Sequence, residues 1–199
     1  MTDRLAPPTF DPADAAAAAA RFAATAPADV TYARVDSPIG TLVAATTPRG
    51  LACLSYEDHD GGLDAVLDRL ATKLSPRILE APARLDDVRR ELDEYFERRR
   101  TTFDLPIDWA LVSPFGRRVL RATAAIPFGE VSTYAQVAAE AGNAKASRAA
   151  GNALGANPMP IVLPCHRVLH TGGKGIGNYT GGVHRKEALL RLEGVLLGG

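Results

Sequence analysis

Three short apolar runs follow residue 29 and predict the strands of a small sheet. They span Val30–Asp36, Gly40–Thr47 and Leu51–Tyr56. The segments Ser37–Gly40 and Thr47–Gly50 separate them, and both combine proline with glycine, which is typical of tight turns. Because tight turns join neighbouring strands that run in opposite directions, we predict an antiparallel meander.

Helical periodicity replaces these runs after residue 60. Residues 61–74 have a helical pattern, and a second set of apolar positions repeats at helical spacing between charged residues. That second set comprises Leu85, Val88, Leu92, Tyr95 and Phe96. Together the strands and helices predict an α+β N-terminal domain over residues 29–108, built as a small antiparallel sheet with helices on one side.

The second half of the chain is dominated by helices with clear ends. Ser113 and Pro114 have the residue types of an N-cap and a first helical position. The segment Pro127–Gly129 stops this helix. Its predicted buried face consists of Phe115, Val119, Ala122 and Ile126.

A helix-turn-helix motif is predicted directly afterwards. Thr133–Gln136 is a capping-box sequence, and it opens a helix that ends near Gly142. After a turn at Gly142–Ala144, a second short helix runs from Lys145 to Leu154. We therefore predict a mostly α-helical C-terminal domain with a helix-turn-helix over residues 109–199.

Composition narrows the class of protein. The 199 residues are 46% apolar and 23% charged, which is an ordinary globular balance. No apolar run reaches the roughly 18 residues that a membrane-spanning helix needs. Residues 1–28 are rich in Ala and Pro, which predicts a flexible tail with a fragile helix around Ala13–Ala24. Two cysteines cannot build a disulfide framework or a cysteine-rich zinc site, so we expect a cytoplasmic protein without a metal or a membrane segment.

Charge is distributed unevenly although it sums to zero. Residues 1–112 contain 13 Lys and Arg against 19 Asp and Glu, whereas residues 113–199 contain 10 against 4. A basic half beside an acidic half suggests a surface for a polyanion. Uneven solvated surfaces explain the same numbers equally well, so charge alone leaves both interpretations open.

The second helix of the predicted motif has small side chains. Between Lys145 and Leu154 it contains mainly Ala, Ser and Gly, with Arg148 as its central long side chain. A helix that reads base edges normally carries several long polar side chains. Small residues let a backbone lie close to another surface, and tight packing within the protein would select them as well.

The strongest chemical signal is the segment Asn157–Val168. Cys165 follows a proline and an apolar run, and it precedes His166 and Arg167. Neighbouring cationic groups lower the pKa of a thiol, which makes Cys165 a candidate activated nucleophile. A buried, inert cysteine is the alternative. A working Cys-His pair also needs a water or a special backbone between its members, and a third group that orients the histidine.

The pentapeptide Pro164–Val168 resembles the active-site signature of the O6-alkylguanine-DNA alkyltransferases, also called methylated-DNA–protein-cysteine methyltransferases. Further segments resemble the family's entry into the helix-turn-helix, its recognition helix and hinge, and its closing loop with the last helix. These segments are Ile126–Val131 with Tyr134, Arg148–Gly151 with Asn157 and Pro158, and Gly177–Gly182 with Lys186, Leu189, Leu190, Glu193 and Gly194. The resemblance is specific over residues 113–194 and looser over residues 29–108.

The resemblance implies a reaction at Cys165. Its thiol would attack the alkyl carbon of O6-alkylguanine in an in-line displacement, and guanine would leave. His166, acting through a water and oriented by Glu193, would accept the thiol proton. Tyr134 would donate its hydroxyl to a ring nitrogen of the leaving base.

The resemblance also implies a substrate pocket and a hinge. Backbone groups around Tyr179 and Thr180 would hydrogen-bond near O6, and main-chain groups at Cys165 and Val168 would bind the amino edge of guanine. Asn157 would fix the turn between the recognition helix and the active-site strand. The thioether product cannot be hydrolysed back to a thiol, so the protein would act once and without a cofactor.

The implied partner is double-stranded DNA that carries O6-alkylguanine, bound through its minor groove by a monomer. The small recognition helix would approach the duplex closely, and degenerate minor-groove readout suits the inspection of damage in any sequence. Arg148 would fill the gap left by the flipped nucleotide. The implied DNA-binding residues are Lys145, Ser147, Arg148, Ala149 and Gly151.

Three other functions are compatible with parts of the sequence. A non-catalytic sensor of alkylated bases would lack the reactive cysteine. A cysteine hydrolase that uses Cys165 and His166 would leave the helix-turn-helix and Arg148 without a purpose. A transcriptional regulator would need neither the Cys165 segment nor a recognition helix that is so poor in long side chains.

A few positions depart from the family pattern or lie outside it. Leu120 stands where the family usually has tryptophan, and we expect this to change packing only. Cys53 is expected to be an inert buried thiol. The glycine-rich segment 171–177 is expected to border the pocket. The histidines that we expect at the surface are His59, His170 and His184.

Overall fold

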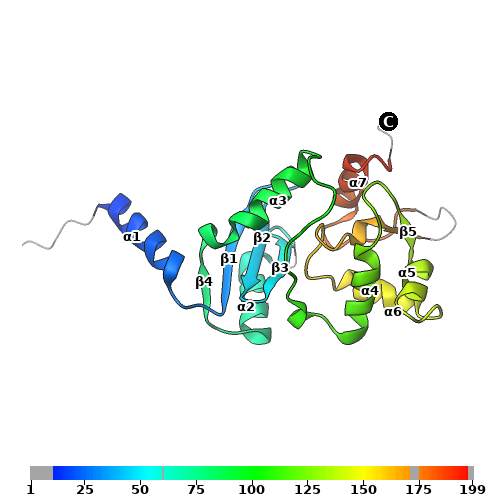
Figure 1. The fold of residues 1–199 in the computed structure, drawn as a ribbon, viewed down its shortest axis with the longest axis horizontal. Helices are drawn as coiled ribbons and strands as arrows, with labels where there is room; N and C mark the ends of the chain where they lie inside the picture. The colour runs from blue at the N-terminus through cyan, green and yellow to red at the C-terminus, as the bar shows by residue number, and fades with distance from the viewer. Residues whose placement is uncertain (1–10, 60, 171–174, 197–199) are drawn as a thin grey trace, which may run out of the picture.

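The structure is a computed structural model that describes residues 11–59, 61–170 and 175–196. Figure 1 shows a sheet with its helices on one side of the molecule and a cluster of helices on the other. The first part contains α1 (Pro12–Thr25), β1 (Val30–Val35), β2 (Leu42–Thr47), β3 (Gly50–Tyr56), α2 (Gly62–Lys73), β4 (Ile78–Glu80), η1 (Pro82–Leu85) and α3 (Asp86–Phe96). The second part contains η2 (Trp109–Leu111), α4 (Pro114–Ala124), β5 (Ser132–Thr133), α5 (Tyr134–Glu140), α6 (Ser147–Gly155), η3 (Cys165–Arg167), β6 (Val168–Leu169) and α7 (Val183–Leu192).

A four-stranded sheet forms the centre of the first part, in the order β3-β2-β1-β4. β1, β2 and β3 form the antiparallel meander that the sequence predicts. β4 pairs with β1 in parallel, with Val30 opposite Ile78, so the sheet is mixed rather than purely antiparallel. The cause is the connection, because α2 carries the chain from β3 at one edge to β4 at the other. The α+β class is confirmed, with this fourth strand added.

Helices cover both faces of the sheet, so the expectation of helices on one side was wrong. Alternate residues of the stretch Leu42–Ala45 in β2 point to two separate hydrophobic clusters, and α3 covers one while α2 covers the other. All residues of that stretch are buried, and a strand buried on both faces shows no apolar-polar alternation in its sequence. The covering residues are Val88, Leu92 and Tyr95 of α3 and Val66 and Leu70 of α2.

The chain between the two parts pairs with the start of β3. The amide of Leu51 donates to the carbonyl of Pro106, and the amide of Asp108 donates to the carbonyl of Leu51, both at 2.8 Å. The buried Asp108 carboxylate accepts a hydrogen bond from Thr47 (2.6 Å) and pairs with Arg49 (2.9 Å). The larger hydrophobic cluster continues from α3 into the second part, so the two parts share a core.

The predicted helix-turn-helix is present as α5 and α6. The Thr133 hydroxyl accepts the Gln136 amide (3.3 Å), and the Thr133 amide donates to the Gln136 side chain (2.9 Å), which confirms the capping box. α6 begins at Ser147, two residues later than expected. Lys145 therefore lies in the turn, where its amide donates to the Asn143 side chain (3.2 Å).

α4 packs against this motif, with the predicted start and a shifted buried face. Ser113 caps the helix as expected. Phe115 and Ala122 are only half-buried, whereas Leu120 is fully buried. The buried residues of α4 are Gly116, Val119, Leu120 and Thr123. The sequence pattern thus predicted the buried side of α4 approximately, but the buried face is rotated toward Leu120 and Thr123.

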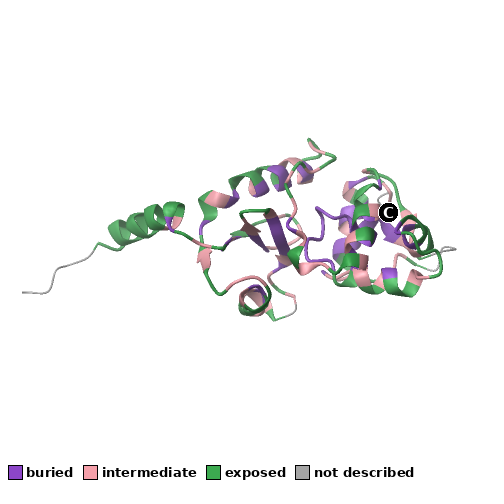
Figure 2. Ribbon diagram, turned by 60° about the horizontal axis from the view of Figure 1, so that its bottom comes forward, coloured by how far each residue is buried: buried purple, intermediate pink, exposed green. Residues whose placement is uncertain are grey.

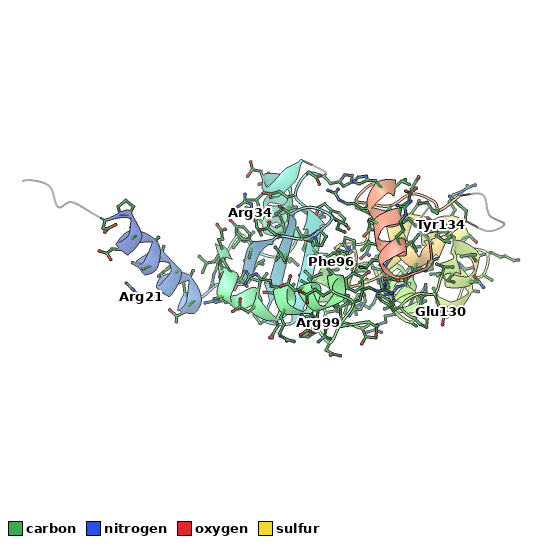
Figure 3. All side chains as sticks on the ribbon, turned by 90° about the horizontal axis from the view of Figure 1, so that it is seen from above. Arg21, Arg34, Phe96, Arg99, Glu130 and Tyr134 are labelled. Carbon is green, nitrogen blue, oxygen red and sulfur yellow. The ribbon has the colours of Figure 1, made fainter. Side chains whose placement is uncertain are left out.

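α1 confirms the helix expected within the Ala-rich tail, and it extends from the sheet into solvent. None of its residues is buried, and Figure 2 shows it as exposed along its length. Arg84 holds its C-terminal end by donating to the carbonyls of Ala24 (3.2 Å) and Ala26 (2.7 Å). In Figure 3, Arg21 on α1 lies at the opposite end of the molecule from Tyr134. Residues 1–10 of the expected tail lie outside the described residues, and no described helix is long and apolar enough to cross a membrane.

Candidate active site

Cys165 lines a cavity of about 330 Å³ that both parts of the chain help to form. The thiol belongs to the short 3₁₀ turn η3 and is buried, with 6% of the residue exposed. α5 and α6 provide one side of the cavity, and the segment before α7 provides another. The lining residues are His59, Tyr134, Gly151, Leu154, Gly155, Cys165, Asn178, Tyr179 and Thr180.

Asn157 organises the chain that leads from α6 to Cys165. Its side-chain amide donates to the carbonyl of Leu163 (2.8 Å), and its side-chain oxygen accepts the amide of Met159 (3.0 Å). The amide also donates to the Cys165 sulfur (3.2 Å). Ile161 in this segment has a φ of 76°, a strained conformation for a β-branched residue. Cys165 thus lies in a turn rather than on the expected strand, and the hinge residue also touches the thiol.

Burial raises the pKa of the Cys165 thiol above its ordinary value. The hydrogen bond from Asn157 and the positive charge of Lys186 act in the opposite direction, but burial dominates. We expected His166 and Arg167 to lower this pKa, and that expectation was wrong, because both side chains are directed to Glu193 instead. At neutral pH the resting thiol is therefore protonated.

His166 is fully buried and bound to the Glu193 carboxylate through Nε2, at 2.8 Å from Oε1. Burial raises the pKa of Glu193, but its contacts with His166 and Arg167 outweigh burial and lower the pKa to about 2. The carboxylate is therefore an anion, and Nε2 of His166 must donate to it. Burial also lowers the pKa of His166, which keeps the imidazole neutral at pH 7. Nδ1 is then the basic nitrogen, and it is buried without a hydrogen-bond partner among the described residues. The imidazole is poised to accept a proton at Nδ1.

Glu193 holds three further groups around this histidine. Arg167 donates to both of its oxygens, from Nε at 2.8 Å and from Nη2 at 2.9 Å. Tyr95 on α3 donates its hydroxyl at 2.7 Å. The amide of Gly129 lies 3.4 Å from Oε2. A carboxylate with a fully buried side chain is thereby matched by one buried guanidinium and several hydrogen-bond donors.

Tyr134 is the first residue of α5 and reaches the cavity from that helix. Its ring lies against Gly151 of α6, whose position would place a Cβ 3.7 Å from the ring, and beside the ring of His170 at 5.1 Å. Burial raises the pKa of Tyr134. The phenol therefore keeps its proton at neutral pH and can donate a hydrogen bond.

The segment before α7 supplies the opposite wall. The Tyr179 hydroxyl lies 3.0 Å from the hydroxyl of Tyr56, and the Thr180 hydroxyl donates to the carbonyl of Gly155 (3.1 Å). Thr180 therefore closes this segment onto the end of α6. Among the residues of the expected glycine-rich border, 171–174 lie outside the described residues.

Lys186 of α7 is a buried cation beneath this wall. Its ammonium donates to the carbonyls of Val168 (2.6 Å) and Asn178 (3.4 Å). Burial lowers its pKa to about 8, so it keeps its charge at neutral pH. The carbonyls of Val168 and Cys165 each already accept one hydrogen bond, the latter from the Val168 amide. A carbonyl has two lone pairs, so this one bond does not saturate either oxygen.

α6 presents the residues expected to bind DNA. Arg148 and Ala149 are exposed, as is Lys145 in the preceding turn, and Ser147 is half-buried. Gly151 lies nearer the protein and lines the cavity. Internal packing uses Ala150 and Leu154, so it does not explain the small residues on the outer side.

Two family models together match nearly the whole described chain. The model of the 6-O-methylguanine DNA methyltransferase ribonuclease-like domain matches residues 30–109. The model of the 6-O-methylguanine DNA methyltransferase DNA binding domain matches residues 114–195. The chain belongs to this family.

Individual relatives agree with the family models. The chain is 38% identical to the methylated-DNA–protein-cysteine methyltransferase of Mycolicibacterium paratuberculosis, over 82% of this chain and 92% of the relative. It is 37% identical to the human protein of the same name, over 82% and 80%. A crystal structure of Mycobacterium tuberculosis OGT in complex with DNA has a TM-score of 0.70 and 34% identity, covering 82% of this chain and 93% of that one. The fold and the sequence thus place the chain in the same family.

Several residues of this methyltransferase site were not expected from the sequence. Tyr95 was read as an apolar position, because its hydroxyl partner Glu193 is 98 residues away. Arg167 was read as a neighbour of the thiol. Lys186 is part of a family motif but carries no sequence signal for burial, and His59 was expected at the surface. In the structure His59 is half-buried and lines the cavity.

Replacing Glu193→Gln is expected to lower the free energy of unfolding by about 3 kcal/mol, because it leaves the Arg167 charge buried without its partner. Urea denaturation of the wild type and the variant measures the difference. Glu187→Gln on α7 is the matched control, since the Glu187 side chain is 40% exposed and pairs with Arg191 at 3.4 Å. An equal effect of both substitutions would contradict the central role of Glu193.

The same pair of proteins is expected to show a specific pH dependence. The pKa of Glu193 is lowered to about 2 from 4.5, so its stabilisation is complete above pH 4.5 and disappears as the pH falls through about 2. The stability difference between the wild type and Glu193→Gln should therefore shrink between pH 5 and pH 2. Unfolding midpoints measured across this range test it, and a constant difference would show that the carboxylate is not the group responsible.

Proposed function

We propose that this family member repairs DNA by direct reversal, moving the alkyl group of O6-alkylguanine in duplex DNA onto the sulfur of Cys165. The observation that carries the proposal is the arrangement of the cavity. The buried thiol of Cys165 lines it, and the next residue, His166, is neutral and held by the buried Glu193 carboxylate. The ring centroid of His166 lies 6.3 Å from that of Tyr179 in the cavity wall. A nucleophile, a base and a group that orients the base are the components that covalent group transfer requires.

The proton of the thiol goes to His166. Nδ1 of this residue is basic and buried, and a water between it and the sulfur would carry the proton. The imidazolium that forms faces the Glu193 anion through Nε2, which stabilises its positive charge. Because burial raises the pKa of the thiol, removal of the proton belongs to the attack itself rather than to the resting state.

The thiolate then displaces guanine from the alkyl carbon. The sulfur–carbon bond forms as the carbon–O6 bond breaks, and the electron pair of that bond goes to the departing purine. Tyr134 donates a hydrogen bond to a ring nitrogen of the purine, and backbone groups near Tyr179 and Thr180 interact with O6. The free lone pairs of the Cys165 and Val168 carbonyls accept from the amino edge of guanine.

A base in duplex DNA reaches this cavity only when it leaves the stack. The cavity volume of about 330 Å³ is in the range of a small-molecule site. α6 borders the cavity through Gly151 and Gly155 and exposes small residues outward, which suits close approach to a minor groove. Arg148 on the same helix is placed to fill the space of the flipped nucleotide. Lys145, Ser147 and Ala149 belong to the same contact surface.

The product explains the expected stoichiometry. A thioether has no carbonyl for water to attack, so each molecule acts once and needs no cofactor. A reducing compartment that holds DNA, such as the cytoplasm of a bacterium, keeps Cys165 as a thiol. One chain carries all the residues named here, so a monomer is the proposed unit.

Incubation with a duplex that contains one O6-methylguanine is expected to add about 14 Da to the protein, on the peptide that contains Cys165. Intact-protein and peptide mass spectrometry measure this gain. Cys165→Ser should show none. Cys53→Ser is the matched control and should gain the same mass as the wild type, because Cys53 is buried against Arg69 on the far side of the sheet from the shared core.

The same experiment separates the proposal from its alternatives. Tight binding to the lesion without a mass gain would indicate a sensor of alkylated bases. Turnover of ester or amide substrates without a stable adduct would indicate a cysteine hydrolase. Neither lesion binding nor a mass gain would exclude the alkyltransferase and the sensor together.

Arg148→Ala is expected to slow single-turnover transfer from duplex DNA by at least about tenfold, because the flipped state loses the side chain that supports it. Transfer from the free base O6-benzylguanine requires no flipping and should change little. Arg89→Ala on α3 removes an equal charge from an exposed ion pair and serves as the control. A parallel loss with the free base would show that Arg148 acts on the protein structure instead.

A further inference from the structure

Tyr56 supports the cavity wall from the first part of the chain. It is the last residue of β3 and is fully buried, with 1% exposed. Its hydroxyl lies 3.0 Å from that of Tyr179, and the two rings meet edge to face with centroids 6.2 Å apart. Within the described part of the chain, Tyr56 is the hydrogen-bond partner of the Tyr179 hydroxyl. The wall residue is therefore held by a residue that does not itself line the cavity.

Arg185 fixes the other side of the Tyr56 ring. Its guanidinium lies 4.3 Å from the ring centroid and is buried, with 7% of the residue exposed. It bonds both oxygens of Asp58 (2.6 and 2.8 Å) and the carbonyls of Ile39 (2.7 Å) and Gly181 (2.9 Å). Nη2 contacts both Asp58 oxygens, while Nε and Nη1 donate to the two carbonyls, so the partners around the planar guanidinium fix its orientation. Arg185 thereby ties the start of α7 to the loops around β3.

Gly181 shows how closely the wall segment is pressed onto Tyr56. A Cβ at this position would lie 2.2 Å from the tyrosine ring, so any other residue would force the ring or the segment to move. The segment that carries Tyr179 thus has the Tyr56 ring directly behind it. It has little room to retreat from the cavity.

We propose that Tyr56, fixed by Arg185, is a specificity-determining residue that limits the size of the alkyl group accepted at Cys165. It acts through Tyr179 and touches no substrate, so it is a positioning residue. The inference rests on the proposed function, because it assigns a substrate range to the same cavity. A methyl group needs little space beside the sulfur, whereas a benzyl group fits only when Tyr179 moves away from the cavity.

The burial of the Tyr56 phenol, against a half-buried Tyr179, explains why the wall resists. Separating the two hydroxyls would leave the buried Tyr56 hydroxyl without its Tyr179 partner, which is costly. Burial also raises the pKa of both tyrosines, so each keeps the proton that their hydrogen bond needs. Removing one hydroxyl abolishes this constraint while leaving both rings in place.

Tyr56→Phe is the direct test, by single-turnover kinetics on duplexes that contain O6-methylguanine or O6-benzylguanine. The ratio of benzyl to methyl transfer rates is expected to rise about fivefold, on the scale of one lost hydrogen bond. Methyl transfer should stay within about twofold of the wild type. Tyr32→Phe is the matched control, because Tyr32 lies in the same sheet and its hydroxyl donates to Glu80 (3.3 Å); its ratio should not change.

Arg185→Lys is the second variant, since it keeps the charge but loses the planar group that stacks on Tyr56 and donates from three nitrogens. It should shift the ratio in the same direction. An unchanged ratio in both variants would overturn the inference, whatever happens to thermal stability, because general destabilisation would slow both transfers alike. Absence of methyl transfer by the wild type would instead overturn the proposed function, and this inference with it.

Discussion

The buried carboxylate of Glu193 is the group on which the rest of the site depends. It joins three segments that are distant in sequence: α3 through Tyr95, the turn η3 through His166 and Arg167, and the C-terminal end of α7, where Glu193 itself lies. An unpaired buried charge costs several kcal/mol. The carboxylate and the guanidinium are therefore tolerable only when all three segments are assembled, and assembly also fixes the imidazole.

This arrangement gives the thiol and its base separate environments. The histidine is neutral and oriented, while the thiol is buried, protonated and bonded to Asn157. A protonated thiol is a poor nucleophile. In the proposed single-use reaction, low reactivity at rest protects Cys165 from other electrophiles. In the proposed mechanism, the base becomes effective only when a substrate and a connecting water complete the path.

The parts of this structure that could be predicted are those with local signals. The capping box at Thr133, the N-cap at Ser113 and the turns of the meander involve residues within a few positions of each other, so the sequence reveals them. β4 is three residues long and is placed by a crossover, which leaves no periodicity to read. The members of the pairs Tyr95–Glu193 and Tyr56–Tyr179 are 98 and 123 residues apart, so no local sequence pattern predicts either contact. Adjacency in sequence was misleading at Arg167, because a tight turn directs neighbouring side chains to different partners.

The first part of the chain is thus more than a separate folded unit beside the active site, because it holds two of the site's residues in place. Tyr95 on α3 donates its hydroxyl to Glu193, the carboxylate that holds His166. Tyr56 on β3 contacts the hydroxyl of Tyr179 in the cavity wall. The sheet of the first part and its helix α3 therefore support the site at two points. The family models divide the chain between residues 109 and 114, yet the hydrophobic core crosses this boundary. Under the proposed role of Tyr56, substitutions in the first part would change the substrate range without altering the residues proposed to contact the base or the DNA.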